Sequence, residues 1–229
     1  SAPLLRKPYL VVAKHYPSYE DIYRYGFVHS RLYAYKEHGT DVDFFEFSTR
    51  AELSYREFEG VNVLCGGATL LDALLASGQI TCLCVHILER SLWEVIKRYL
   101  GKVKIIIWCH GAEIQLWHRR SFEFCCMDEE SITKTKKASD ARQALWQEVF
   151  QAHNHLQFVF VSQYFKDEVY KDLGIHHNVK CHVIPNYIDS NRFPYQEKNP
   201  NDRLNILSIR PYTSMVYAND LMVESILKL

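Results

Sequence analysis

The stretch ITCLCVHILERSLWEVIKRYLGKVKIIIWCHG (residues 80–111) decides the fold class of this chain. Two short apolar runs, residues 80–87 and 103–109, flank an amphipathic segment, residues 89–100, that Gly101 ends. The apolar runs are nearly continuous rather than alternating, which indicates strands that are covered on both faces. The stretch therefore predicts a strand-helix-strand unit within a parallel sheet.

The same alternation extends over most of the chain. The sequence predicts further strands at residues 9–14, 41–47, 61–65, 158–161 and 180–184, and helices at 20–38, 68–77, 139–153 and 163–173. Ser162 is placed to cap the last of these helices, and Gly174 is placed to end it. About seven strand-helix units predict an α/β fold with a doubly wound parallel sheet, which is Rossmann-like.

Two stretches interrupt the alternation. Residues 119–137 carry mixed charges without a clear period, and we expect a mobile surface loop there. Residues 186–203 are polar and turn-rich, contain Pro194 and Pro200, and lead into a new apolar run. The sequence thus predicts a first domain over residues 1–185, a linker over 186–203, and a strand and helix of a second domain over 204–229.

Composition excludes several classes of function. Lys and Arg together number 27, as do Asp and Glu, so no overall positive charge attracts nucleic acid. Several of the seven cysteines lie inside apolar runs, which favours a reducing compartment. No apolar run is long enough to span a membrane. We therefore expect a cytoplasmic location, and peripheral contact with the inner face of the membrane stays open through the aromatic and basic residues near Trp117 and Phe122.

The sharpest candidate site follows the strand at residues 103–109. In an open parallel sheet, ligands bind beyond the carboxyl ends of the strands. His110 and Gly111 stand at that point, and Glu113 follows closely. An imidazole there can hydrogen-bond a hydroxyl or orient a phosphate, although a single histidine can also be purely structural.

A second candidate site follows the first predicted strand. Tyr19, Tyr23, Arg24, Gly26 and His29 surround the expected start of a helix. A helix start offers free N–H groups to an anion, and tyrosines can stack on a sugar ring. The alternative is that these tyrosines only pack against the helix.

The remaining polar motifs indicate a hinge rather than catalysis. Asn186 and Asp189 can bond within their own turn, and Phe193 can anchor the linker in a pocket. The chain has no paired CxxC or HExxH spacing, so no metal site is predicted. A phosphate-binding loop, a dinucleotide fingerprint and a nucleophile elbow are also absent from the sequence.

These features together resemble a GT-B glycosyltransferase of family 4. The similarity rests on the His-Gly pair after the fifth predicted strand, on VIPNYIDSNRF (residues 183–193), and on LNILSIRP with the helix that follows (residues 204–229). It spans most of the chain but is specific mainly over residues 158–229. The resemblance implies two Rossmann-like domains facing each other across a cleft, with the acceptor held mainly by the first and the nucleotide-sugar by the second.

The resemblance also implies roles for particular residues. His110 matches the active-site histidine beside the donor sugar, with Gly111 and Glu113 on the donor side, and Arg210 matches the arginine that binds the donor diphosphate. The loop from Tyr19 to His29 matches the acceptor side. The lysine that commonly follows the arginine is absent from residues 211–217.

By resemblance, the full enzyme transfers a sugar from a nucleotide-sugar to a carbohydrate or lipid-linked acceptor with retention of configuration, in surface polysaccharide biosynthesis. No cofactor is implied, because the nucleotide-sugar is a substrate. The glutamate pair of the second domain would follow Leu229, so this fragment is expected to be inactive. Residues 204–229 are expected to dock on the first domain, to form a dimer with another chain, or to be poorly ordered.

Two other classes of function stay open. One is a non-catalytic module that binds carbohydrate or protein and reuses half of the fold. The other is a GT-B-like sugar-nucleotide epimerase or a phosphorylase, which shares the architecture.

Overall fold

The computed structural model describes residues 5, 7–50, 53–176, 178–191, 193–204, 206–208 and 217–228 of the chain. Its contacts divide the chain into two units. Unit 1 comprises Ser1–Leu116 and Ser139–Ile188, and unit 2 comprises Trp117–Ala138 and Asp189–Leu229. The sheet and every residue of the site described below belong to unit 1.

Unit 1 contains an eight-stranded sheet with the order β3-β4-β2-β1-β5-β6-β7-β8. Its strands are β1 (Tyr9–Ala13), β2 (Asp43–Phe47), β3 (Ser54–Phe58), β4 (Val61–Gly66), β5 (Cys82–His86), β6 (Lys104–Cys109), β7 (Leu156–Phe160) and β8 (Cys181–Val183). All neighbouring strands pair in parallel except β3 and β4. The chain therefore has the predicted α/β fold with a mostly parallel, Rossmann-like sheet.

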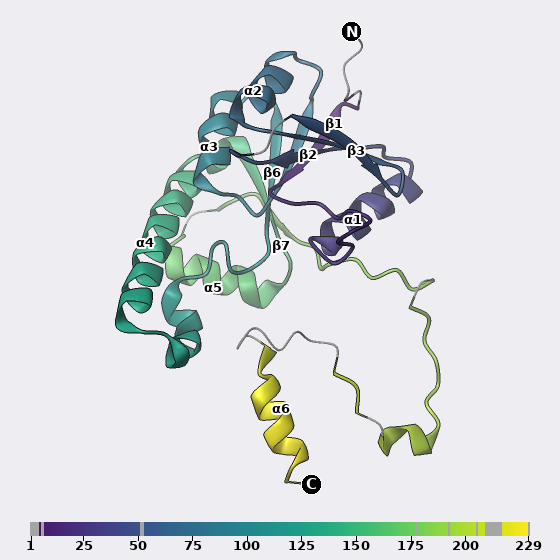
Figure 1. Cartoon of the computed structure of the whole chain (residues 1–229). Coiled ribbons are helices and arrows are strands. Elements are labelled where there is room, and N and C mark those ends of the chain that lie inside the picture. Colours follow the sequence, from purple (N-terminus) through teal and green to yellow (C-terminus); the bar gives the residue numbers. More distant parts are fainter. Residues whose placement is uncertain are drawn as a thin grey trace. The chain divides into compact units, whose positions relative to one another are not determined.

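Helices cover both faces of the sheet (Figure 1). They are α1 (Gly26–Glu37), α2 (Ala68–Ala76), α3 (Arg90–Ile96), α4 (Glu129–Gln151) and α5 (Gln163–Leu173). One core cluster joins α2, α3, α4 and α5 to the sheet, and another joins α1 to it. Alternate residues of β1 enter the two clusters, Leu10 and Val12 the first, Val11 and Ala13 the second. This alternation explains why the strand sequence is apolar throughout.

The first predicted helix begins later than expected. Residues 20–25 are not helical, because Ser18 and Asp21 exchange backbone hydrogen bonds in a turn and Tyr25 adopts a left-handed conformation with φ of 57°. Helix α1 starts only at Gly26. A turn therefore lies between β1 and the helix, and it brings Tyr25 and Arg24 to the carboxyl edge of the sheet.

The prediction of a mobile surface loop at residues 119–137 is wrong. The 3-10 segment η2 (Trp117–Cys126) and the first turns of α4 occupy it. The Asp128 carboxylate accepts a hydrogen bond of 2.7 Å from the Ser131 N–H, which caps the helix, and Glu129 and Glu130 favour its positive end. Lys136 lies 4.5 Å from the centre of the Trp117 ring within the same unit. Local capping therefore stabilises a helix in a segment whose apolar residues do not recur at helical spacing.

The edge strand β3 has no counterpart in the sequence prediction. It pairs antiparallel with β4 through a tight turn at Glu59 and Gly60, which have φ values of 45° and 79°. Such a two-residue turn with positive φ is the usual connection of a hairpin. Because β3 lies at the edge and is mostly exposed, its sequence shows no apolar run.

The strand predicted from residue 204 is not present in the described residues. Leu204 ends the 3-10 segment η4 (Pro200–Leu204), and residues 206–208 belong to no strand. The predicted terminal helix is confirmed as α6 (Asn219–Ile226), and its apolar residues Leu221 and Leu227 are exposed. The domain boundaries at residues 185 and 203 stay a prediction. In the described part of the chain, no helix has both the length and the apolar character needed to cross a membrane.

The predicted cap of α5 is confirmed, and it allows a test of local stability. The Ser162 hydroxyl accepts a hydrogen bond of 3.1 Å from the Phe165 N–H, and Gly174 ends the helix with φ of 65°. Ser162→Ala is expected to lower the free energy of unfolding by about 1 kcal/mol, whereas Ser162→Asp is expected to preserve it. Urea unfolding of the three proteins measures the difference, and equal destabilisation by both variants would contradict the capping role.

Candidate functional site

His110 lies where β5, β6 and α1 meet at the carboxyl edge of the sheet. It directly follows β6, and its Nε2 atom is 2.9 Å from Nδ1 of His86, the last residue of β5. The ring of Phe27, at the start of α1, is centred 4.7 Å from the His110 ring. The structure therefore places His110 at the carboxyl edge of the sheet, as predicted, and adds a second histidine that was not predicted.

A buried stack of rings supports this histidine pair. The fully buried His86 ring lies nearly parallel to the ring of Trp108, with centres 5.3 Å apart. The guanidinium carbon of Arg31, from α1, is 3.8 Å from the centre of the Trp108 ring, which is a cation-π contact. Arg31 also donates a hydrogen bond of 2.9 Å to the carbonyl of Pro185. Within the described residues, no carboxylate pairs with this buried guanidinium.

Both histidines of the pair are neutral at pH 7. Burial and the nearby Arg31 charge lower the pKa of His110 to about 4. Burial, together with His110 and Arg31, lowers the pKa of His86 well below its ordinary value. A neutral imidazole offers a ligand one hydrogen-bonding nitrogen without a formal charge.

Glu113 holds the loop that carries His110. Its carboxylate accepts hydrogen bonds from the backbone N–H groups of His110 and Gly111, the latter at 2.9 Å. Burial raises the pKa of the Glu113 carboxyl, although the two N–H groups oppose the rise. The indole N–H of Trp146, from α4, donates a bond of 2.7 Å to the Glu113 carbonyl. The predicted donor-side role of Gly111 and Glu113 stays a prediction, and in this structure Glu113 clamps the loop.

The predicted acceptor residues fall into two groups. Tyr19 and Tyr23 are exposed, and Gly26 is the first residue of α1 with open space around it. Arg24 extends to the carboxyl edge, where its Nη2 atom is 3.0 Å from His15 Nε2.

His29, on α1, is instead buried in the core. Its Nδ1 atom is 2.7 Å from the Tyr16 hydroxyl, and its Nε2 atom is 2.8 Å from Glu59. With both ring nitrogens bonded, His29 has a packing environment rather than a free position toward a ligand.

A polar cluster at the ends of β1 and β2 was not predicted. Arg56, on β3, donates to Glu46 at 2.6 Å and to the Tyr16 carbonyl at 3.0 Å, and His15 Nδ1 is 3.9 Å from Glu46. Burial raises the pKa of Glu46 and lowers that of His15. The ring of Tyr25 contacts His15 at 5.3 Å, which joins this cluster to Phe27 and His110. His15 and Glu46 could have been found from their places at strand ends, whereas Arg56 carries no such signal.

An open groove of about 650 Å³ lies at the same edge, beyond β1, β2 and β5. Three cations, three hydroxyl groups, one carboxylate and one aromatic ring line the groove. They belong to Lys14, Arg50, Arg90, Ser48, Thr49, Ser91, Glu89 and Phe47. Lys14 pairs with Glu89 at 3.3 Å, and Arg90 pairs with residues of the helices. Because Lys14 and Arg90 are ion-paired, Arg50 is the lining cation that forms no ion pair within the described residues, and it suits an anionic ligand with hydrogen-bond acceptors.

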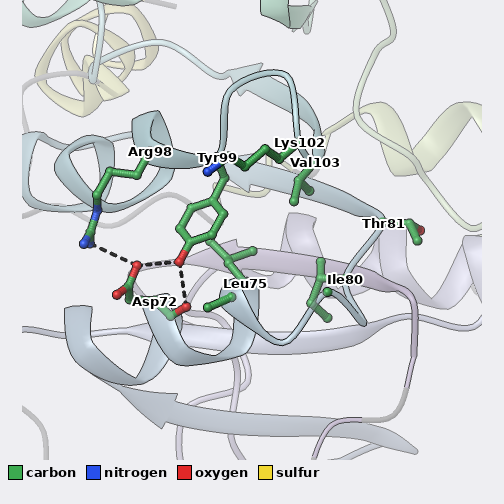
Figure 2. A pocket seen from close by; sticks show the side chains of 10 residues that line it. Asp72, Leu75, Ile80, Thr81, Arg98, Tyr99, Lys102 and Val103 are labelled. Carbon is green, nitrogen blue, oxygen red and sulfur yellow. Dashed lines mark hydrogen bonds and ion pairs between the residues drawn. The ribbon is translucent and has the colours of Figure 1, made fainter.

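A further hollow lies at the opposite, amino end of β5 and β6 (Figure 2). There the Tyr99 hydroxyl donates to the Asp72 carboxylate at 2.6 Å, and Arg98 pairs with the same carboxylate at 3.3 Å. Figure 2 shows these groups directed toward one another. These groups bond one another and so connect α2 to η1 (Lys97–Tyr99). The hollow lies away from the carboxyl edge, where ligands of parallel sheets bind, so substitutions in it can serve as controls.

The hinge role of Asn186, Asp189 and Phe193 stays a prediction. The Asp189 carboxylate accepts a hydrogen bond of 2.9 Å from the Asn191 N–H, which is the expected turn. Asn186 and Phe193 are exposed within their own units, and the anchoring of Phe193 in a pocket stays a prediction. Arg210 lies outside the described residues. Across the described part of the chain, no three His, Cys, Asp or Glu residues are grouped so that they could hold a metal ion.

Comparison with known proteins adds a likeness of fold only. No protein-family model and no curated protein sequence matches the chain. A solved structure described as "Trehalose-6-phosphate from E. coli bound with UDP-2-fluoro glucose" aligns with a TM-score of 0.44 and 11% identity. The alignment covers 80% of this chain and 50% of that one, so the match extends over half the length of the E. coli protein.

Proposed function

We propose that this chain is the acceptor-side part of a retaining glycosyltransferase that transfers a sugar from a nucleotide-sugar to a carbohydrate or lipid-linked acceptor. The observation that carries the proposal is the neutral histidine pair at the carboxyl edge, with His110 Nε2 held 2.9 Å from His86. Surface polysaccharide biosynthesis is the expected setting. We expect a cytoplasmic location, and peripheral contact with the inner face of the membrane stays open.

The surroundings of His110 suit a sugar. The His110 Nδ1 atom forms no hydrogen bond within the described residues and is available to a ligand hydroxyl or phosphate oxygen. The Phe27 ring contacts the His110 ring, and the Tyr25 ring contacts Phe27, so flat aromatic rings of the kind on which sugar rings stack lie close to the site. A neutral imidazole can bond a hydroxyl at pH 7 without the cost of burying a charge.

The groove beside β1, β2 and β5 favours the lipid-linked class of acceptor. Lipid-linked sugars carry phosphate, and the groove presents Lys14, Arg50 and Arg90 together with three hydroxyl groups. Cations and hydroxyl groups in one concave surface form charge-assisted hydrogen bonds with phosphate oxygens. The donor side, with Arg210 and a second domain, remains a proposal that rests on the sequence resemblance.

Calorimetry can test the proposed division between acceptor and donor. UDP-, GDP- and ADP-sugars, a hexose 1-phosphate and the free hexose would be titrated into this chain and into one extended through a complete second domain. We expect this chain to bind the sugar phosphate, and only the extended chain to bind a nucleotide-sugar and transfer its sugar. If neither protein binds a nucleotide-sugar while this chain binds saccharides, the binding module is the correct reading and the enzyme proposal fails.

The groove gives a variant test with a matched control. Arg50→Ala is expected to weaken hexose 1-phosphate binding about tenfold, because a charge-assisted hydrogen bond contributes roughly 1.4 kcal/mol. Binding of the uncharged hexose should not change. Lys102→Ala, in the hollow at the amino end of the sheet, removes an equal charge away from the groove and should leave both affinities unaltered. An equal loss in the two variants would show that only overall charge matters.

A further inference from the structure

We propose that His86 is a positioning residue for His110: its buried imidazole donates from Nδ1 to His110 Nε2 and fixes the tautomer of His110 that presents Nδ1–H to the crevice. The inference deepens the proposed function, since it states how His110 meets a substrate. The tautomer itself, however, can be measured without any catalytic activity.

Two paired strands hold the two rings together. His86 ends β5 and His110 follows β6, and these strands pair in parallel with His86 opposite Trp108. His86 is completely buried, stacked on Trp108, and 2.9 Å from His110 through Nδ1. Side chains locked in this way by packing and by hydrogen bonds can hold a neighbouring site residue in one geometry.

Burial and the charges around the pair disfavour the protonated form of both rings. Arg31 carries a permanent charge and faces the pair from α1 through its contact with Trp108. Glu113, in the loop after β6, is the nearby carboxylate, but it accepts hydrogen bonds from the backbone N–H groups of His110 and Gly111. With both histidines neutral, each ring carries one proton, and only the choice of nitrogen remains.

The burial of Nε2 determines which nitrogen of His86 carries the proton. Its Nε2 atom is buried and has no hydrogen-bond partner within the described residues. Buried N–H groups without partners are rarer in proteins than acceptors without partners. The proton of His86 therefore belongs on Nδ1, which donates to His110 Nε2. His110 must then carry its own proton on Nδ1, the nitrogen that is available to a ligand.

The consequence is that His110 acts as a hydrogen-bond donor to an oxygen of the bound molecule. Three contacts orient its ring: the bond to His86, the backbone clamp of Glu113, and the ring of Phe27. A donor in a fixed direction recognises a hydroxyl or phosphate oxygen and disfavours a ligand that presents an N–H group at this point.

Long-range ¹H–¹⁵N NMR of the ring nitrogens in this chain tests the proposal directly. At pH 7 the His110 Nε2 signal is expected to have the shift of an unprotonated nitrogen, and the Nδ1 signal that of a protonated one. The His86 ring should show the same tautomer. His110→Asn identifies the His110 signals by their loss. A His110 ring protonated on Nε2, or on both nitrogens, would overturn the proposal.

Two variants of His86 separate positioning from simple packing. His86→Asn retains an N–H group at the place of Nδ1 and should preserve the His110 tautomer. His86→Ala removes the donor, so a second His110 tautomer should appear and hexose 1-phosphate should bind about fivefold to tenfold more weakly. An unchanged tautomer in His86→Ala contradicts the proposal.

If His86→Ala does not fold, the spectra of the wild-type chain and of His86→Asn still show which tautomer His110 adopts, and so still test the proposal. Failure of the glycosyltransferase proposal alone would leave the NMR result intact, because the measurement involves no nucleotide-sugar. In an extended chain that transfers sugar, His86→Ala should lower kcat more than it changes KM, with rescue by Asn.

Discussion

Lowering the pH from 7 to 5 is expected to destabilise the folded chain, and His86 and His110 should account for much of the loss. Both pKa values are lowered in the folded state, mainly by burial, from the ordinary value of 6.5. The unfolded chain therefore binds more protons than the folded chain below pH 6.5. Stability is fully present above that pH and is lost as the pH falls toward the folded pKa, which is about 4 for His110.

The expected size of this effect follows from proton linkage. Each buried histidine that stays neutral contributes a loss of up to about 1.4 kcal/mol per pH unit below 6.5. Two carboxyl groups act in the opposite direction, because burial raises the pKa values of Glu46 and Glu113. The folded chain gains protons there as the pH falls, which offsets part of the loss. The histidine contribution must therefore be isolated by substitution.

Urea unfolding at pH 7, 6 and 5 should be compared in the wild-type chain and in the double variant His86→Asn with His110→Asn. We expect the double variant to lose about 2 to 4 kcal/mol less stability between pH 7 and 5 than the wild-type chain. His182→Asn provides the control, because His182 is exposed on β8. Parallel pH profiles of the wild-type chain and the double variant would show that the pair does not titrate as described.

The strands of the sheet could be predicted because burial on both faces makes them visible in the sequence. The predicted runs at residues 80–87 and 103–109 contain β5 and β6, and the sheet is parallel there as expected. Burial of this kind comes with covering helices, so the fold class followed from a local pattern. The edge strand β3 was missed because one of its faces is exposed and its partner is reached through a turn.

The first turns of α4 show why the loop prediction failed. Residues 119–137 lack an apolar period because few of their side chains are buried. Their helix depends on the Asp128 cap and on acidic residues in the first turn, both of which are readable in the sequence. Periodicity alone was therefore the wrong criterion for this segment.

The candidate site was predictable where it depends on position along one strand. His110 was found because it follows an apolar run directly. His86 occupies the last place of its own strand and belongs to an apolar run, so nothing in the local sequence separates it from a packing residue. The approach of Arg31 to Trp108 and Pro185 joins residues far apart in the chain, and no local pattern contains such a contact.

Trp146→Ala is expected to lower the free energy of unfolding by about 3 to 5 kcal/mol. Trp146 is fully buried and packs near Phe150 in the main core cluster, so its loss removes a large apolar surface and leaves a cavity. The substitution also removes the indole N–H that bonds the Glu113 carbonyl at 2.7 Å. Because the free energy of unfolding of a domain is only about 5 to 15 kcal/mol, this single substitution can remove much of the stability of the fold.

Trp146→Phe separates packing from the hydrogen bond. The phenyl ring retains most of the buried surface, and the expected loss is about 1 to 2 kcal/mol from the unpaired Glu113 carbonyl and the smaller ring. Trp117→Ala is the matched control, because Trp117 is only partly buried and its cation-π contact with Lys136 contributes roughly 0.5 to 1 kcal/mol.

Urea unfolding followed by circular dichroism measures the three variants, since fluorescence would change with each tryptophan removed. In Trp146→Phe, the ring signals of His110 should shift while those of the exposed His182 remain, because the Glu113 loop carries His110. If Trp146→Ala lowers the free energy of unfolding no more than Trp117→Ala does, the packing of Trp146 in the core does not stabilise the fold as described. If the His110 signals are unmoved in Trp146→Phe, the bond from α4 to the Glu113 carbonyl does not position the loop, and the His86 contact alone orients the ring.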